Sequence, residues 1–246
     1  MKRQTGTALA LNWIAGYVDA VGFIVFFQVY LGNMTGNTVA IAEGVVQRRL
    51  DLLLKRGLAI PEFIAGLLVS RLLVEVLVRK GIIRVGAIAY GLEMLALLLL
   101  TILGSSASRT AAITPENSLL YVLIGLGAFA MGLQNATNTH FGPLDVRTTH
   151  VTGTISTFAD HVAKYMVEKR AEERHKAALY AAMWFLYLAG GIGGLVFLGV
   201  WYLRCLYIPV IGLAVIIVAD IVRPCGFSVG AVCDRPVRDS RKNGRS

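Results

Sequence analysis

The chain has 246 residues, of which 56% are hydrophobic and 16% are charged, and its net charge is +9. Soluble domains carry about a quarter charged residues, so this composition excludes an ordinary soluble protein and predicts an integral membrane protein. The positive charge does not indicate nucleic-acid binding, because residues 223–246 alone contribute +4 (six basic, two acidic) and other basic residues lie mainly at the ends of apolar runs.

Six apolar runs are long enough to cross a bilayer as helices, since about 20 residues span a hydrocarbon core of about 30 Å. They cover residues 8–31, 58–78, 85–103, 119–137, 177–200 and 203–222. Two further segments, 35–46 and 152–165, are shorter and more polar, and each follows a break rich in Gly, Asn and Thr. We interpret them as re-entrant half-helices or as parts of broken helices. Short, steep spans are the alternative, and they give eight crossings in place of six.

The distribution of Lys and Arg predicts the orientation, because basic residues favour the cytoplasmic side of a membrane. Lys2 and Arg3, the five basic residues in 164–176 and the basic tail all suit the cytoplasm. We therefore expect a multi-pass protein of the inner (plasma) membrane with both termini cytoplasmic. The basic loop 47–56 fits poorly, because a six-span arrangement places it outside. Eight spans bring this loop inside but also move 105–117 to the inside.

A weak internal duplication is the most informative feature of the sequence. The segment Gly16-Tyr-Val-Asp-Ala20 is followed by Thr35-Gly-Asn37, and Gly132-Leu-Gln-Asn-Ala136 is followed by Thr152-Gly-Thr154. In both copies a helix with a polar residue precedes a break, a Thr-Gly pair and a short helix. Chance similarity is the alternative, because Gly, Ala and Thr are common in membrane helices.

The duplication divides the chain into three predicted parts. These are a first membrane repeat (1–110), a second membrane repeat (111–223) and a basic, disordered cytoplasmic tail (224–246). With three spans each, the second repeat enters the membrane from the opposite side, which gives the inverted repeat found in many transporters. With four spans each, the repeats are parallel.

The same motifs resemble the YoaK-like family of bacterial integral membrane proteins of unknown function. The matching segments are residues 16–23 (GYVDAVGF), 33–38 (NMTGNT), 132–136 (GLQNA) and 148–154 (TTHVTGT). Glu93 also lies where that family tends to carry an acid, and the resemblance extends to about Arg223. It implies an all-α, polytopic membrane helix bundle with two similar halves, and it implies no substrate, reaction or site.

Two acidic residues inside apolar runs are candidates for proton coupling. Asp19 lies in the first run and Glu93 in the third, where a charged side chain costs about 2.5–3.5 kcal/mol on insertion scales. Intramembrane acids commonly serve ion or proton transfer; the alternative is a buried hydrogen bond between helices. Asn135 replaces Asp19 in the second repeat, so only one copy can titrate.

The two Thr-Gly turns are candidates for solute binding, because a helix start offers free N–H groups and the positive end of a dipole to an anion or a carboxylate. Ordinary helix capping by Thr and Asn is the alternative. The predicted substrate-binding residues are Asp19, Thr35, Gly36, Asn37, Asn135, Thr152, Gly153 and Thr154.

The leading functional hypothesis is a small secondary transporter or permease for a small polar or anionic solute, with no cofactor and no metal. An intramembrane enzyme acting on lipid-linked substrates is the second hypothesis, with His150, Asp160 and His161 as its candidates. A non-catalytic membrane scaffold is the third. The expected partners are membrane lipids and the solute, without nucleic acid, and a homodimer is left open.

Overall fold

The computed structural model describes residues 2–82, 84–109, 114, 117–141 and 151–222, all of them helical or in turns and loops. In chain order the elements are α1 (Lys2–Val25), α2 (Met34–Val46), α3 (Leu50–Arg79), α4 (Val85–Arg109), α5 (Ser118–Phe141), α6 (Val151–Glu168), α7 (Ala171–Trp201), the 3-10 helix η1 (Tyr202–Leu206) and α8 (Tyr207–Ile221). The predicted tail, His150 and the motif residues 148–149 lie outside the described residues.

The prediction of an all-α, polytopic membrane bundle is confirmed. Five described segments are long and apolar enough to cross a membrane, and the last of them, Ala171–Ile221, contains both α7 and α8. The six predicted apolar runs therefore correspond to α1, α3, α4, α5, α7 and the pair η1–α8. The two short polar segments correspond to α2 and α6.

Several helix boundaries differ from those of the predicted runs, and two of the differences, both within residues 1–110, bear on the site. The first helix ends at Val25, six residues before the predicted run ends, because Phe27 and Gln28 adopt left-handed φ angles of 55° and 65° and reverse the chain. The predicted basic loop 47–56 is helical from Leu50 onward, since it forms the start of α3.

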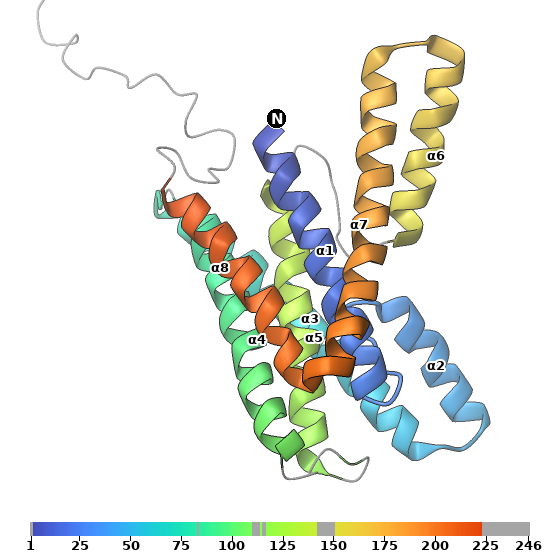
Figure 1. The fold of residues 1–246 in the computed structure, drawn as a ribbon, viewed down its shortest axis with the longest axis vertical. Coiled ribbons are helices and arrows are strands. Elements are labelled where there is room, and N and C mark those ends of the chain that lie inside the picture. The colour runs from blue at the N-terminus through green and yellow to red at the C-terminus, as the bar shows by residue number, and fades with distance from the viewer. Residues whose placement is uncertain (1, 83, 110–113, 115–116, 142–150, 223–246) are drawn as a thin grey trace, which may run out of the picture.

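The long helices alternate in direction through the bundle. In Figure 1, α1, α4 and α7 run downward, whereas α3, α5 and α8 run upward, so the N-terminus and the end of α8 lie at the same end. The short helix α2 packs on α3, and α6 packs on α7. These two hairpins point to opposite ends of the bundle (Figure 1).

Helices α1 and α7 cross with their backbones in contact. A Cβ atom at Gly16 would overlap the Tyr187 carbonyl oxygen, and one at Gly190 would overlap the Trp13 carbonyl oxygen. Only glycine permits this approach. The small residues of the fifth apolar run therefore act as a packing face.

Helices α3 and α5 repeat this crossing. A Cβ at Gly132 would overlap the Phe63 carbonyl oxygen, and one at Gly66 would overlap that of Phe129. On α5, Gly132 and Phe129 lie 116 residues after Gly16 and Trp13 of α1. On α7, Gly190 and Tyr187 lie 124 residues after Gly66 and Phe63 of α3. The two crossings thus use matching positions in the two halves of the chain.

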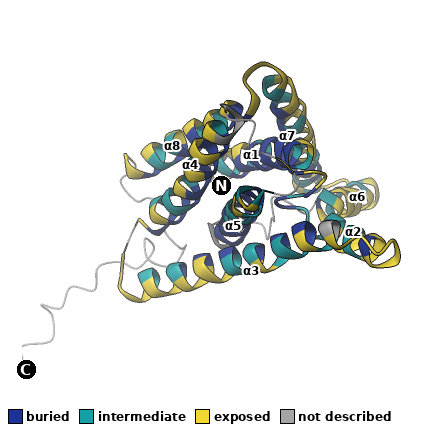
Figure 2. Cartoon of the chain, turned by 90° about the horizontal axis from the view of Figure 1, so that it is seen from below, coloured by how far each residue is buried: buried dark blue, intermediate teal, exposed yellow. Residues whose placement is uncertain are grey.

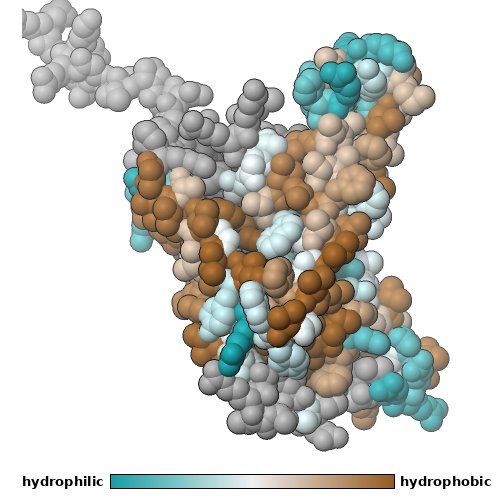
Figure 3. Space-filling view, viewed as in Figure 1, coloured by the Kyte–Doolittle hydropathy of each residue, from teal (hydrophilic) through white to brown (hydrophobic). Residues whose placement is uncertain are grey.

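The bundle is apolar on its outside as well as inside. Figure 2 shows buried residues concentrated on α1, α5 and the inward sides of the other helices. The outward sides of α3, α4, α7 and α8 expose many Leu, Ile and Val side chains. Figure 3 shows these side chains covering the middle of the bundle, while polar residues gather at the tip of the α6–α7 hairpin and at the α2–α3 hairpin. This pattern fits a hydrocarbon belt between two aqueous ends.

Candidate functional site

Asp19 joins α1 to the following turn and to α7. One carboxylate oxygen accepts hydrogen bonds from the backbone N–H groups of Leu31 (2.9 Å) and Gly32 (2.7 Å). The other accepts from the hydroxyl of Tyr187 at 2.7 Å. The side chain is buried, so the acid is shielded from lipid and fully used as an acceptor.

The turn after α1 is held in place by the side chain of Leu31. A Cβ at Gly22 on α1, or at Gly127 on α5, would lie 2.7 Å from a methyl group of Leu31. Leu31 therefore fills a pocket between two helices that glycine leaves open. Asp19 fixes the backbone of this turn, and the two glycines leave the space that holds the Leu31 side chain.

Asn37 clamps the other end of the turn. Its side-chain oxygen accepts from the Tyr30 N–H (3.0 Å), and its amide donates to the Tyr30 carbonyl (2.7 Å). Asn33 caps α2 by accepting from the Gly36 N–H at 3.1 Å. Asn37 is fully buried and occupied by these bonds, so in this conformation it positions the turn and does not face a solute.

A cavity of about 750 Å³ lies where the two short helices begin. Thr35 and Gly36 line it from α2, and Thr152 and Gly153 line it from α6. The remaining lining residues are Tyr30, Gly32, Asn33, Met34, Val39, Ala40, Glu43, Phe63, Val151 and Tyr187. The structure thus brings the two Thr-Gly turns, which are 117 residues apart, to one space.

The other predicted site residues lie behind this lining. Asp19 is screened from the cavity by Gly32 and Tyr187, and Thr154 is mostly buried. Asn135 is also buried, and its side-chain oxygen has no partner among the described residues. The segment that the duplication places opposite Asn135 falls in 142–150, outside those residues.

The cavity is chemically asymmetric although its positions match. Tyr187 on α7 corresponds to Phe63 on α3, and both line the cavity. Asp19 on α1 corresponds to Asn135 on α5. The acid and its hydroxyl donor are therefore replaced together in the other half, by an amide and an apolar ring. The role of Tyr187 was not predicted. The only feature of the sequence that points to it is Gly190, one helical turn later, which marks the contact of α7 with α1.

Among the described residues that line the cavity, Glu43 is the one that carries a charge. Its carboxylate lies 3.6 Å from the Arg56 guanidinium, which also donates to the Ala40 carbonyl at 3.1 Å. Arg56 is 4% exposed. Arg56 was predicted to lie in a basic loop, whereas it belongs to α3 and docks α2 on that helix beside the cavity.

Lys55 is buried as well, and its ammonium lies 5.1 Å from the centre of the Phe27 ring. A cation near an aromatic face is stabilised by the ring quadrupole. Because Lys55 and Arg56 are part of the folded bundle, only Arg48 and Arg49 remain as exposed basic residues in segment 47–56. Fewer exposed basic residues therefore oppose the placement of this segment outside, which a six-span orientation requires.

Glu93 is not among the residues that line the cavity and lies within the first half of α4. It is fully buried, and neither carboxylate oxygen has a hydrogen-bond partner among the described residues. One turn before it is buried Tyr90. Asp220 on α8 accepts from the Ala87 N–H (3.0 Å) at the start of α4. Asp220 is fully buried and links the two helices.

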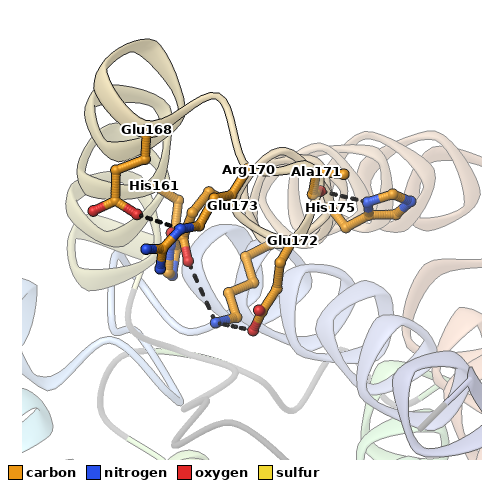
Figure 4. A network of polar contacts seen from close by, with 8 residues as sticks. His161, Glu168, Arg170, Ala171, Glu172, Glu173 and His175 are labelled. Atoms are coloured by element: carbon orange, nitrogen blue, oxygen red, sulfur yellow. Dashed lines mark hydrogen bonds and ion pairs between the residues drawn. The ribbon is translucent and has the colours of Figure 1, made fainter.

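His161 belongs to a polar network at the α6–α7 hairpin, shown in Figure 4. Its Nδ1 lies 2.6 Å from a Glu173 oxygen, and its ring stacks on Tyr180 with centroids 5.6 Å apart. Within the described part of the chain, no three His, Cys, Asp or Glu residues are grouped closely enough to hold a metal ion. His161 therefore holds the hairpin together in this conformation.

Comparison with known proteins identifies the family. Residues 7–219 match the family described as a protein of unknown function (DUF1275). The chain belongs to this family. The chain is also 24% identical, over 180 residues, to the UPF0700 transmembrane protein YoaK of Bacillus subtilis (strain 168), and this match covers 72% of the chain and 76% of YoaK. The YoaK-like resemblance is thereby confirmed. No solved structure matches the chain.

Proposed function

We propose that this DUF1275 protein is a small secondary transporter or permease for a small polar or anionic solute. The observation that carries the proposal is the shared cavity, lined by Thr35 and Gly36 of one half and by Thr152 and Gly153 of the other. Transporters commonly bind their solutes where two broken helices meet at the interface of two repeats.

The directions of the helices support an inverted repeat of three spans plus one short helix. Helix α5 runs opposite to its counterpart α1, and the pairs α3/α7 and α4/α8 do the same (Figure 1). The glycine crossings of α1 with α7 and of α5 with α3 use matching positions. The cavity adjoins both crossings, because Tyr187 belongs to one crossing, Phe63 belongs to the other, and both residues line the cavity.

The cavity lining favours recognition by backbone and hydroxyl groups. It contains two helix starts, whose N–H groups and dipoles attract negative charge, and the hydroxyls of Thr35, Thr152 and Tyr187. No Lys or Arg is among the described residues that line the cavity. These features suit a small solute with a carboxylate or another compact polar group. The buried acids Asp19 and Glu93 are the candidates for proton coupling.

The proposal includes the location and orientation inferred from the basic residues. The protein would lie in the inner (plasma) membrane with both ends cytoplasmic, in contact with lipids along its apolar belt. The structure supports this by placing the described chain ends, the turn between α3 and α4 and the charged α6–α7 tip at one end (Figure 1).

The test is solute uptake by proteoliposomes, with organic anions, inorganic anions and small neutral metabolites as probes. We compare the native chain with Gly36→Val, whose side chain would press on the Tyr30 ring, since a Cβ there lies 2.8 Å from it. The matched control is Gly57→Val, because a Cβ at Gly57 meets nothing within 4 Å. We expect uptake of one solute class, reduced at least about tenfold in Gly36→Val and retained in Gly57→Val.

A second variant, Thr152→Val, examines the other half by removing one hydroxyl at constant shape, and we expect weaker solute binding. Absence of flux for every probe, from folded native protein, would overturn the transporter proposal. In that case the enzyme hypothesis gains weight if His161→Gln abolishes an activity on lipid-linked substrates.

A further inference from the structure

The buried acids Asp19 and Glu93 have opposite surroundings. Asp19 accepts three hydrogen bonds, from two backbone N–H groups and one hydroxyl. Glu93 is equally buried, yet neither of its oxygens has a hydrogen-bond partner among the described residues. Such a difference separates the roles of two groups that the sequence alone treats alike.

The hydrogen bonds indicate which form of each acid is stable. Donors that point at both oxygens stabilise a carboxylate, and bonds to an ionised group are about twice as strong as neutral ones. A buried carboxylate without a partner carries a large desolvation penalty, which a bound proton removes. The hydrogen bonds to Asp19 offset part of the cost of a charge there. No such bond from the described residues offsets it for Glu93, which is therefore stable as a neutral acid in this conformation.

The groups around Glu93 do not offer a charge to neutralise it. On α4 the nearest ionisable side chain is Tyr90, and α8 contributes Asp220, which is itself acidic. The other described ionisable groups on elements packed against α4 include Tyr121 on α5, Arg204 and Cys205 in η1, and Tyr207 on α8. The described ionisable residues of α3 and its C-cap are Lys55, Arg56, Glu62, Arg71, Glu75, Arg79 and Lys80. None of these gives Glu93 a hydrogen bond or ion pair in the described structure.

The position of α4 suits an exchangeable proton. Although α4 belongs to the first half, it packs against α5 and α8 of the second half. A movement of one half against the other therefore changes the surroundings of α4. Leu100 lies two turns after Glu93 on α4. A Cβ at Gly127 would lie 2.7 Å from a methyl group of Leu31 and 3.0 Å from one of Leu100. Helix α4 therefore also approaches the turn that Asp19 anchors.

We propose that Glu93 is the residue that carries the exchangeable proton, and that Asp19 is the hydrogen-bonded anchor of the cavity turn. The ligand of the Glu93 site is a proton, taken up or released when the halves move. The coupling step rests on the proposed transporter function, but the protonation of Glu93 does not.

Infrared difference spectroscopy of the protein in lipid nanodiscs tests the assignment directly. A protonated carboxyl group gives a C=O stretch that a carboxylate lacks. We expect this band in the native protein and in Asp19→Asn, and we expect it to be lost in Glu93→Gln. The matched control is Glu75→Gln, an exposed acid on α3 paired with Arg79, which should leave the band unchanged. A band that persists in Glu93→Gln and disappears in Asp19→Asn would reverse the assignment.

Thermal stability provides a second measurement that does not depend on spectroscopy. Glutamine resembles neutral Glu93, so Glu93→Gln should unfold at or above the native temperature. Asp19→Asn weakens three hydrogen bonds and should unfold at a lower temperature. Equal loss in both variants would contradict the separation of roles.

Coupling is then measured as uptake driven by a pH gradient in proteoliposomes. We expect it to be lost in Glu93→Gln and partly restored in Glu93→Asp, which keeps a titratable group. If native protein moves solute independently of pH, the coupling step is wrong. If it moves no solute at all, the proposed function fails while the infrared result still decides whether Glu93 holds a proton.

Discussion

At the scale of single residues, the contact between Asp19 and Tyr187 connects the cavity to helix packing. Tyr187 lines the cavity, donates to Asp19, and contributes the carbonyl against which Gly16 packs. One residue thus joins the cavity wall, the anchored turn and the α1–α7 crossing. The corresponding residues in the other half, Phe63 and Asn135, keep the packing and lack the hydroxyl and the charge.

Removing the Tyr187 hydroxyl isolates that contact. We expect Tyr187→Phe to lower the free energy of unfolding by about 1–2 kcal/mol, because a buried hydrogen bond to a carboxylate is lost while the ring is kept. Thermal unfolding in detergent measures the change, with Tyr207→Phe as the control at an exposed ring. An unchanged Tyr187→Phe variant would mean that the bond contributes little to stability.

At the scale of elements, the short helix α2 depends on the buried cation Arg56. Its guanidinium reaches the Ala40 carbonyl and Glu43 on α2, and Gln28 in the preceding turn at 3.5 Å. Because α2 packs mainly on α3, few other contacts hold it. The cavity wall formed by α2 is therefore only as stable as this docking.

Replacing Arg56 should loosen α2 selectively. We expect Arg56→Ala to destabilise the docked helix by about 1–2 kcal/mol, a value kept small because Glu43 is half exposed and screened by solvent. Hydrogen exchange of residues 34–46 measures the effect, which should exceed that on α5. The exposed Arg48→Ala provides the control, and equal exchange in the two variants would argue against the docking role.

The crossing of α1 and α7 makes a stronger prediction, because backbone lies against backbone there. Gly190→Val should force the helices apart and lower the free energy of unfolding by at least about 2 kcal/mol. Gly199→Val on the same helix is the matched control, since a Cβ there meets nothing within 4 Å. Thermal unfolding compares the two. A Gly190→Val protein as stable as the control would show that the helices do not approach this closely.

At the scale of the whole molecule, periodicity and composition predicted much of the bundle. The apolar runs marked the long helices, and the Thr-Gly pairs marked the starts of α2 and α6 within a residue. The reversal after Val25 was not predictable, since Phe27 and Gln28 are not residues that favour left-handed φ angles. Tyr187 and Arg56 were missed for a similar reason: their roles come from tertiary contacts between elements distant in sequence.

The number of crossings is the remaining prediction about the molecule as a whole, and four positions decide it. The start of α1, the end of α3 and the start of α7 lie toward one end of the bundle, and the turn between α2 and α3 lies toward the other (Figure 1). Gly6, Lys80 and Glu172 lie in or beside the first three segments, and Arg48 lies in that turn. Six crossings therefore predict that cysteines at the first three positions react from one side of the membrane and a cysteine at Arg48 from the other. Eight crossings predict a different pattern, with Lys80 on the side opposite to the other three.

Single cysteines, introduced after Cys205, Cys225 and Cys233 are replaced by serine, measure this pattern with a membrane-impermeant thiol reagent in intact and permeabilised cells. We expect the six-crossing pattern, because α2 has 13 residues and a helix of that length extends only about 20 Å, short of the roughly 30 Å hydrocarbon core. Labelling of Arg48→Cys from the same side as Gly6→Cys, with Lys80→Cys on the opposite side, would establish eight crossings. The two repeats would then be parallel, and the cavity would lose its place between inverted halves.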